Sequence, residues 1–231
     1  MIVEDRGPEA VGVDACGAVE VVIVDDHRLL ADSLALALEG HGIRAILPAL
    51  GTPEALLADV IEQRPDLVLL DLDLGGDVGD GSTLVRPLVE AGLRVLIVTA
   101  TTDVEQMARA VELGAVGVAA KNGPFPELLD TVVTAARGGE VMTPLARLRL
   151  LDEARRRRDR RASAMAPFGR LTERESEVLR ELTRGRAVAE IARSSVVSEA
   201  TVRSQVRCIL TKLGVRSQLE AVVAAQRSNW H

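Results

Sequence analysis

The feature that most constrains the fold of this chain is a regular alternation of short apolar runs with longer amphipathic stretches. Five apolar runs have the length and the aliphatic content of buried strands, at residues 21–24, 43–47, 67–70, 95–98 and 116–119. Apolar residues recur at helical spacing after each run, at residues 29–39, 53–63, 82–90, 104–113 and 126–137. Five strands that alternate with five helices predict an α/β fold with a doubly wound, mostly parallel sheet.

The alternation stops after Gly139, where a basic segment begins that we expect to be a partly helical linker. From residue 171 helical periodicity continues almost to the end of the chain, with helices expected near residues 172–184, 187–194, 199–213 and 217–227. We therefore divide the chain into a flexible extension, an α/β domain, a basic linker and a small all-helical domain, at residues 1–18, 19–139, 140–169 and 170–231.

Signals for helix ends support these boundaries. Glycines that suit a left-handed helix end follow several of the expected helices, namely Gly40, Gly92, Gly114 and Gly138. Two S/T-x-x-E patterns in the last domain fit the capping box of a helix start, Thr172 with Glu175 and Ser217 with Glu220.

Charge divides the chain in the same way. Residues 1–144 carry nine Lys and Arg against 24 Asp and Glu, a net charge of −15, whereas residues 145–231 carry 19 against ten, a net charge of +9. The basic half suits a polyanion, because neutralised phosphates release counterions. The six arginines within residues 155–161 are either an arm that contacts DNA phosphates or a solvated tether, and their like charges favour the tether.

Composition excludes several classes of protein. With no Tyr, two Phe and one Trp, the chain is not expected to bind nucleic acid by aromatic stacking. Cys16 and Cys208 lack the spacing of a disulfide framework or a zinc site, so we expect free thiols. No apolar run is long enough to span a membrane, and the acidic N-terminus does not fit a signal peptide. We therefore expect a cytoplasmic protein with no membrane partner.

Polar residues stand at the carboxyl ends of four predicted strands, as Asp25, Asp26, Asp71, Thr99 and Lys121. Because such ends meet at one rim, where open α/β sheets bind ligands, we expect these side chains to converge. Asp71 suits a nucleophile on a rigid rim, and clustered carboxylates suit Mg²⁺. Thr99 and Lys121 could bind phosphoryl oxygens. The group predicts a phosphorylatable aspartate with its metal and charge partners.

These residues resemble the receiver domain of bacterial two-component response regulators, over about residues 19–138. The match lies in Val-Asp-Asp-His at 24–27, Pro-Asp-Leu-Val-Leu-Leu-Asp at 65–71, Leu-Ile-Val-Thr-Ala at 96–100 and the stretch from Gly114 to Lys121. The resemblance implies a flavodoxin-like fold in which Asp71 accepts a phosphoryl group from a histidine kinase. It also implies Mg²⁺ bound by Asp26, Asp71 and the backbone carbonyl of Asp73, beside Asp25. Thr99 and Lys121 would then bind the phosphoryl group.

Two positions depart from that family. A loop rich in Gly and Asp, containing Gly75 and Gly76, replaces the usual Met-Pro after the acceptor strand. Val118 stands three positions before the lysine, where the family usually has an aromatic switch residue, and Val has no ring to turn toward Thr99. A phosphorylation-independent regulator is therefore the alternative, and it predicts unchanged DNA binding in Asp71→Ala.

The last domain resembles the LuxR-type helix-turn-helix of the NarL/FixJ regulators, over residues 170–226. The match lies in Leu-Thr-Glu-Arg-Glu at 171–175, Glu-Ile-Ala at 190–192, Ser-Glu-Ala-Thr-Val-Arg at 198–203 and Lys-Leu-Gly-Val at 212–215. One face of the recognition helix is apolar, through Val202, Val206, Ile209, Leu210 and Leu213. The predicted DNA contacts are Ser198, Thr201, Arg203, Ser204, Gln205, Arg207 and Lys212. Arg203 and Arg207 lie one turn apart and suit the major groove.

Together the motifs predict a phosphorylation-controlled transcription regulator and not an enzyme. Its partners would be a histidine kinase, promoter DNA and a second copy of the chain, with the last helix as a candidate dimer contact through Leu219, Val222 and Val223. The enzyme alternative is a phosphatase of the haloacid dehalogenase type, because Asp71-Leu72-Asp73 fits an Asp-x-Asp pair. Chain order opposes it, since that pair ends the first strand in those enzymes and a helix-turn-helix has no place there.

Overall fold

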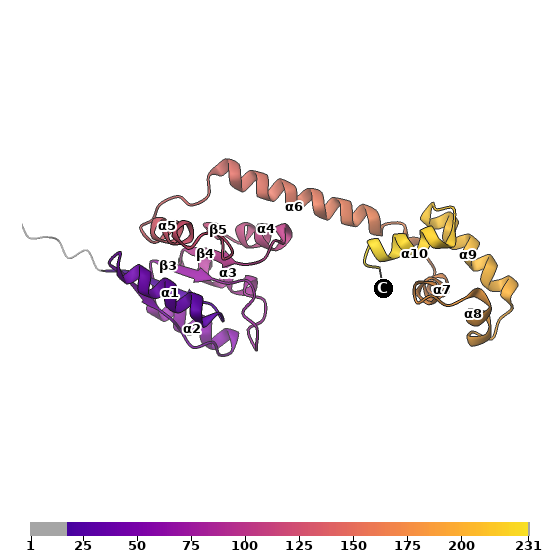
Figure 1. Ribbon diagram of the computed structural model, residues 1–231, viewed down its shortest axis with the longest axis horizontal. Coiled ribbons are helices and arrows are strands. Elements are labelled where there is room, and N and C mark those ends of the chain that lie inside the picture. Colours follow the sequence, from indigo (N-terminus) through magenta and orange to yellow (C-terminus); the bar gives the residue numbers. More distant parts are fainter. Residues whose placement is uncertain (1–17, 231) are drawn as a thin grey trace, which may run out of the picture. The chain divides into compact units, whose positions relative to one another are not determined.

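The computed structural model describes residues 18–230, so the N-terminal extension and Cys16 lie outside the described part, apart from Ala18 (Figure 1). Packing divides the chain into two compact units, one ending at Leu151 and the other beginning at Asp152. Among the described helices, none is both long and apolar enough to cross a membrane.

The first unit is built on a five-stranded parallel sheet with the strand order β2-β1-β3-β4-β5. The strands are β1 (Val19–Val24), β2 (Ile43–Ile46), β3 (Leu67–Leu70), β4 (Val95–Thr99) and β5 (Gly117–Ala120). This confirms the predicted doubly wound sheet. The strand order reverses between β1 and β3, which is the position where sheets of this kind bind their ligands.

Helices cover both faces of the sheet (Figure 1). They are α1 (Arg28–Glu39), α2 (Pro53–Gln63), α3 (Ser82–Glu90), α4 (Val104–Glu112) and α5 (Phe125–Ala136). Alternation along β1 explains the two layers: Val21 and Ile23 face the core with α1 and α5, whereas Val22 and Val24 face the core with α2, α3 and α4. Because both faces are covered, the central strand β3 is a continuous apolar run, as are residues 21–24 of β1 and 95–98 of β4.

One predicted helix end is wrong. Gly92, Gly114 and Gly138 adopt the left-handed conformation, but Gly40 has a right-handed φ of −62°. The chain after α1 continues through a further turn, in which the backbone N–H of Gly42 donates to the carbonyl of Glu39. Gly42, with φ of 72°, is therefore the left-handed residue at this end.

The predicted linker contains one uninterrupted helix, α6 (Pro144–Met165), which is more regular than expected. Ion pairs at i,i+4 spacing support it, Asp152 with Arg156 and Glu153 with Arg157, each at 2.9 Å. The hydrogen bond from Arg157 lowers the pKa of Glu153.

The start of α6 is tied to the first unit by Arg147. Its guanidinium donates to the carbonyl oxygen of Val111 at 3.2 Å and to that of Ala115 at 2.8 Å. Val111 lies in the last turn of α4, and its carbonyl oxygen, which also accepts from the backbone N–H of Gly114 at 3.2 Å, takes a further hydrogen bond from Arg147. The first turn of α6 therefore belongs to the α/β unit.

The second unit is helical, as predicted. After a short 3₁₀ turn, η1 (Phe168–Arg170), it contains α7 (Glu173–Thr183), α8 (Val188–Ser194), α9 (Glu199–Leu213) and α10 (Gln218–Arg227). Its core joins all four helices, with Leu179, Val202 and Ala225 fully buried. Near the C-terminus, Trp230 stacks on Phe168 with ring centroids 5.4 Å apart.

The two predicted capping boxes differ. At α7 the box is complete, because Thr172 Oγ1 accepts from the backbone N–H of Glu175 and the carboxylate of Glu175 accepts from that of Thr172. At α10 it is half formed: Ser217 Oγ accepts from the backbone of Glu220, but the carboxylate of Glu220 accepts from the backbone of Arg216.

Candidate functional site

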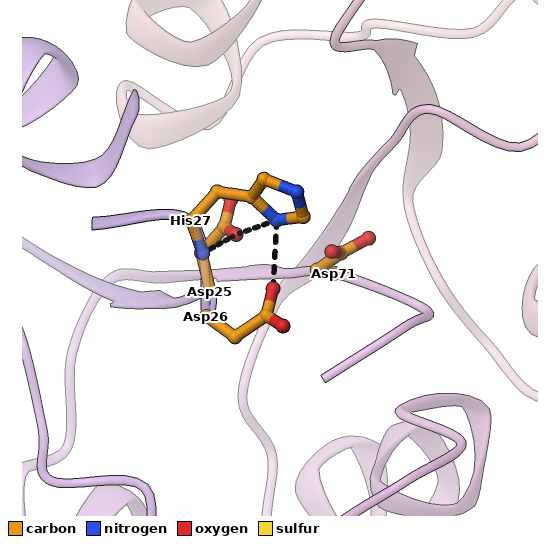
Figure 2. Close-up of side chains that lie close together, drawn as sticks. All are labelled: Asp25, Asp26, His27 and Asp71. Atoms are coloured by element: carbon orange, nitrogen blue, oxygen red, sulfur yellow. Dashed lines mark hydrogen bonds and ion pairs between the residues drawn. The ribbon is translucent and has the colours of Figure 1, made fainter. Parts of the chain in front are cut away.

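The carboxyl ends of β1 and β3 bring together an acidic cluster with one histidine. Figure 2 shows Asp25, Asp26 and His27, which follow β1, beside Asp71, which follows β3. Each of the four side chains offers a ligand atom, and these atoms lie within 4.8 Å of one another. The predicted convergence of the aspartates therefore rests on the neighbouring positions of two parallel strands at the point where the strand order reverses.

Lys121 closes the buried side of this cluster. Its Nζ lies 2.6 Å from Asp71 Oδ2 and 2.8 Å from the carboxylate of Asp25. The lysine side chain is only 6% exposed, and the Asp71 side chain 3%. Two buried carboxylates thus share one buried ammonium, which offsets part of their repulsion and of the cost of burial. Lys121 reaches this place because its backbone N–H continues the pairing of β5 with Thr99.

Hydrogen bonds to neighbouring backbone groups hold Asp71 in place. Its N–H donates to the carbonyl of Val24, and its Oδ1 accepts from the N–H of Leu72 at 2.7 Å. Gly81, which the sequence analysis did not single out, packs against the carbonyl oxygen of Asp71, and a Cβ at this position would lie 2.0 Å from that oxygen. The need for glycine at position 81 arises from the close approach of two segments in the folded chain. The sequence carries no signal for it other than the glycine itself.

The Gly- and Asp-rich loop after Asp71 is compact. It folds back on itself through the hydrogen bond from Leu74 N to Gly79 O, and its apolar side chains Leu74 and Val78 are buried with the α2–α4 face. Gly75 lies against the acidic cluster, since a Cβ there would be 3.2 Å from Asp26 Oδ2. The loop thus forms one wall of the acidic cluster.

A cleft of about 740 Å³ opens above Asp71. Its lining includes His27, Asp71, Asp73, Asp80, Thr99 and Gln106. Thr99 Oγ1 accepts from the backbone N–H of Thr101 at 3.2 Å, which leaves the hydroxyl hydrogen available for a group bound in the cleft. Val118 is half-buried against the α2–α4 face.

The donor set fits Mg²⁺, which prefers carboxylate and carbonyl oxygens and retains several waters. Asp26 is the most accessible carboxylate of the cluster, with its side chain 37% exposed, and Lys121 does not contact it. Asp25 and Asp71 lie deeper, and Asp73 lines the same cleft. A cation could therefore enter beside Asp26 and meet oxygen ligands from both strands.

The second candidate site is the exposed face of α9. Ser198 caps the helix, because its Oγ accepts from the backbone N–H of Thr201 at 3.1 Å. Val202 and Ile209 are buried, whereas Arg203, Ser204 and Arg207 are exposed on the other side. Arg203 pairs with Glu199 at 2.9 Å. The helix thus presents two cations one turn apart.

Two of the other predicted contacts lie differently. Gln205 is half-buried, and its Oε1 is buried with no hydrogen-bond partner in the described residues. Lys212 Nζ donates to Glu175 at 2.5 Å, so a contact with DNA would compete with this ion pair. The capping role of Glu175 was predicted from the sequence, but its pairing with Lys212, which lies 37 positions away, was not.

Burial raises the pKa of Glu175, but the hydrogen bonds from Lys212 and Thr172 outweigh burial and leave that pKa below its ordinary value. The carboxylate is therefore ionised and joins the start of α7 to the end of α9. On α10, Leu219 and Val223 are exposed and Val222 is half-buried. Among the described residues, part of the predicted apolar face of α10 is therefore exposed and accessible to a partner.

Comparisons with known proteins match both units of the chain. Residues 21–133 match the response regulator receiver domain, and residues 170–225 match the luxR family of bacterial regulatory proteins. A probable transcriptional regulatory protein NarL of Mycobacterium tuberculosis is 30% identical over 209 residues, covering 90% of this chain and 94% of the relative. The transcriptional regulatory protein LnrK of Bacillus subtilis is 28% identical over 214 residues, covering 90% and 97%.

The response regulator VraR of Staphylococcus aureus is 28% identical over 211 residues, covering 91% of this chain and 98% of the relative. These matches extend over both units and follow the predicted order of a receiver before a helix-turn-helix. They support a transcription regulator and give no support to a phosphatase of the haloacid dehalogenase type. The chain belongs to the family of transcriptional response regulators in which a receiver domain is followed by a luxR-type DNA-binding domain.

Proposed function

We propose that phosphorylation of Asp71 controls the binding of α9 to promoter DNA. The observation that carries this proposal is the ion pair of Lys121 with Asp71 and Asp25, which places a nucleophile and a cation at one end of a cleft. The same chain carries a capped helix with two exposed arginines. The boundaries that we propose are residues 19–139 for the receiver and 170–231 for the DNA-binding domain.

In the proposed reaction, a carboxylate oxygen of Asp71 attacks the phosphorus of a phosphohistidine on a sensor kinase. The oxygen–phosphorus bond forms while the nitrogen–phosphorus bond breaks, and the histidine leaves with the bonding electron pair. When bound by Asp25, Asp26, Asp71 and the carbonyl of Asp73, Mg²⁺ supplies positive charge to the phosphoryl oxygens.

The surrounding side chains would then change partners. Lys121 now pairs with Asp71, and we expect its ammonium to move to a phosphoryl oxygen once that carboxylate is esterified. Thr99 would donate its hydroxyl hydrogen to another oxygen. A phosphoryl group adds nearly two negative charges, which is sufficient to bias a two-state surface. Since Val118 has no ring to move, we propose that Thr99 and Lys121 carry the change without an aromatic switch.

At the output end, Arg203 and Arg207 are the proposed groups that enter the major groove, with Ser204 between them. Ser198, Thr201, Gln205 and Lys212 are further predicted contacts at or near the same helix. Leu219 and Val223 on α10 are the proposed contact of a homodimer, which would match paired half-sites. Since its targets are a kinase domain and chromosomal DNA, we place the protein in the cytoplasm.

The test is the affinity for a promoter pool, measured with and without a small phosphodonor plus Mg²⁺, for the wild type and for Asp71→Asn. We expect the donor to tighten binding by the wild type and to leave the variant unchanged. Asp66→Asn is a matched control, because Asp66 lies at the other end of β3, where its carboxylate accepts from the backbone of Glu20.

Equal binding by the wild type and Asp71→Asn under all conditions would contradict the switch and favour the phosphorylation-independent regulator. Turnover of a phosphate monoester that is lost in Asp73→Asn would instead indicate a phosphatase. Binding that responds to the donor in Asp71→Asn as well would place the acceptor elsewhere.

A further inference from the structure

His27 lies beside the acidic cluster as a potential metal ligand, a role that the Mg²⁺ site does not require. Its Nδ1 is 2.7 Å from Asp26 Oδ1 and 3.4 Å from Asp25 Oδ1 (Figure 2). Together with Asp71, these are the four residues whose ligand atoms lie within 4.8 Å of one another. The site therefore offers one imidazole nitrogen in addition to carboxylate oxygens.

The spacing of these atoms suits a shared cation. Divalent metals bind nitrogen and oxygen ligands at about 2.0–2.2 Å, so neighbouring ligands in one coordination sphere lie roughly 3 Å apart. The two distances from His27 Nδ1, 2.7 and 3.4 Å, lie on either side of that value. A small movement of an exposed side chain would bring the nitrogen and both oxygens to one cation.

The backbone already places His27 for this role. Its N–H donates to Asp25 Oδ1 at 2.8 Å, and its carbonyl accepts from Ala31 N in the first turn of α1. The His27 imidazole is 65% exposed, so a metal ion can reach it from solvent. The residue is thus fixed at its backbone and accessible at its ring.

Lys121 determines the side from which a cation can enter. Its ammonium fills the buried side between Asp25 and Asp71, so the accessible side is the one formed by Asp26 and His27. A cation that arrives there meets Asp26 and His27 before it reaches the deeper carboxylates. The nitrogen would therefore take part in the first contacts of any metal that enters.

We infer that His27 is a nitrogen ligand and that it shifts this site from Mg²⁺ toward transition metals such as Mn²⁺ and Zn²⁺. Imidazole suits Zn²⁺ and its neighbours in the first transition row, whereas Mg²⁺ prefers oxygen alone. This inference rests on the metal site of the proposed function but not on phosphoryl transfer to Asp71. It identifies the residue that sets metal preference at the phosphorylation site.

The test uses the full chain with Mn²⁺ and Zn²⁺ as probes, at one fixed pH. Calorimetric titration of the wild type, His27→Ala and His41→Ala gives the affinities, and His41 is a matched control because it is an exposed histidine at the far end of α1. We expect His27→Ala to weaken Mn²⁺ and Zn²⁺ binding by about 10- to 100-fold and Mg²⁺ binding by less than about threefold. His41→Ala should leave all three affinities unchanged.

A spectroscopic signature separates direct ligation from a structural effect. The electron spin echo of Mn²⁺ bound to the wild type should show nitrogen coupling from a ligated imidazole, and this coupling should vanish in His27→Ala and persist in His41→Ala. If Mn²⁺ binds the wild type without nitrogen coupling, the role of His27 is wrong and the Mg²⁺ site of the proposed function stands. If no divalent cation binds the wild type, both the inference and the proposed metal site are wrong. If His27→Ala keeps the wild-type ratio of Mn²⁺ to Mg²⁺ affinity, His27 does not set metal preference.

Discussion

At the scale of single residues, Asp71 can take its position only because Gly81 has no side chain and so leaves room for the Asp71 carbonyl oxygen. The φ of Gly81 is −59°, which any residue can adopt, so the requirement for glycine is one of space. The Cβ of an alanine would lie 2.0 Å from the carbonyl oxygen of Asp71, and this contact involves backbone that cannot turn aside as a side chain can. The backbone of Asp71, the proposed phosphorylation site, therefore packs directly against the loop that follows it.

We expect Gly81→Ala to reduce the free energy of unfolding of the first unit by about 1–3 kcal/mol, because the extra carbon forces the backbone to move. Urea denaturation followed by far-UV circular dichroism measures the loss. Gly51→Ala is the control, since a Cβ there meets no atom within 4 Å. Equal stability of the two variants would show that the loop yields without cost.

A second residue-scale prediction concerns Glu175, whose pKa is depressed in the folded chain. A depressed pKa stabilises the fold above the unfolded value, which is 4.5, and this contribution is lost as the pH falls through the folded pKa. We expect Glu175→Gln to cost about 1.5 kcal/mol at neutral pH, the low end for a charged hydrogen bond, because Lys212 is partly exposed.

The difference in unfolding free energy between the wild type and Glu175→Gln should therefore shrink as the pH falls below 4.5. Urea titrations at a series of pH values measure it. Glu173→Gln, at an exposed position in the same first turn of α7, should show little difference at any pH. A difference that stays constant through the acid range would mean that the carboxylate is not the source of the stability.

The residues that sequence could predict are those whose role follows from a strand end or a helix cap. Asp71 and Lys121 are of this kind, since parallel strands deliver their last residues to one rim whatever lies between them. Gly81 and the pairing of Glu175 with Lys212 depend on how separate segments approach, and no local pattern encodes that approach. His27 was visible in the sequence, but its position beside Asp26 depends on the backbone of the turn before α1.

At the scale of elements, α6 shows a competition between charge and helix propensity. A run of like charges favours an extended tether, and for this reason the sequence predicts only a partly helical segment. The acidic residues Asp152 and Glu153 stand four positions before arginines, which is the favourable order for ion pairs on a helix, and the helix is continuous. The signal was present in the spacing, but the arginine run obscured it.

The contact of Arg147 with the end of α4 gives the element-scale prediction. We expect Arg147→Ala to speed hydrogen exchange in the first turns of α6, because the helix start loses its two hydrogen bonds to Val111 and Ala115. Exchange measured by mass spectrometry on peptides from residues 142–151 tests this. Arg149→Ala, at an exposed position on the same helix, is the control. Unchanged exchange in Arg147→Ala would show that the helix start is held by other contacts.

At the scale of the whole molecule, the chain joins an acidic part to a basic part, with net charges of −15 over residues 1–144 and +9 over residues 145–231. DNA binding by the basic part should weaken steeply with salt, with a slope of log affinity against log salt of about −0.9 for each phosphate neutralised. The acidic cluster suits a divalent cation for the same reason that the basic helix suits a phosphate. Because the two parts carry opposite net charge, the acidic part favours cations and the basic part favours the DNA polyanion.

For Arg207, the proposed role is to read a base edge. Arg207→Gln should therefore reduce the preference for operator over random DNA by about 1–3 kcal/mol, with a smaller effect on random DNA. Fluorescence anisotropy of labelled duplexes measures both affinities over a range of salt. Arg227→Gln at the end of α10 is the control. A uniform loss on all sequences, with a slope shallower by about one, would show instead that Arg207 contacts a phosphate.

Trp230, which stacks on Phe168, makes the intrinsic fluorescence of the two units different. Trp230 is the only tryptophan and the chain has no tyrosine, so its intrinsic emission comes almost wholly from one side chain. That side chain is half-buried against the core of the second unit, with the guanidinium of Arg180 5.6 Å from its ring. Emission therefore reports on the DNA-binding unit alone, while the receiver unit contributes almost none. Any change in that emission when a phosphodonor is added would be a direct record of the signal passing from one half to the other.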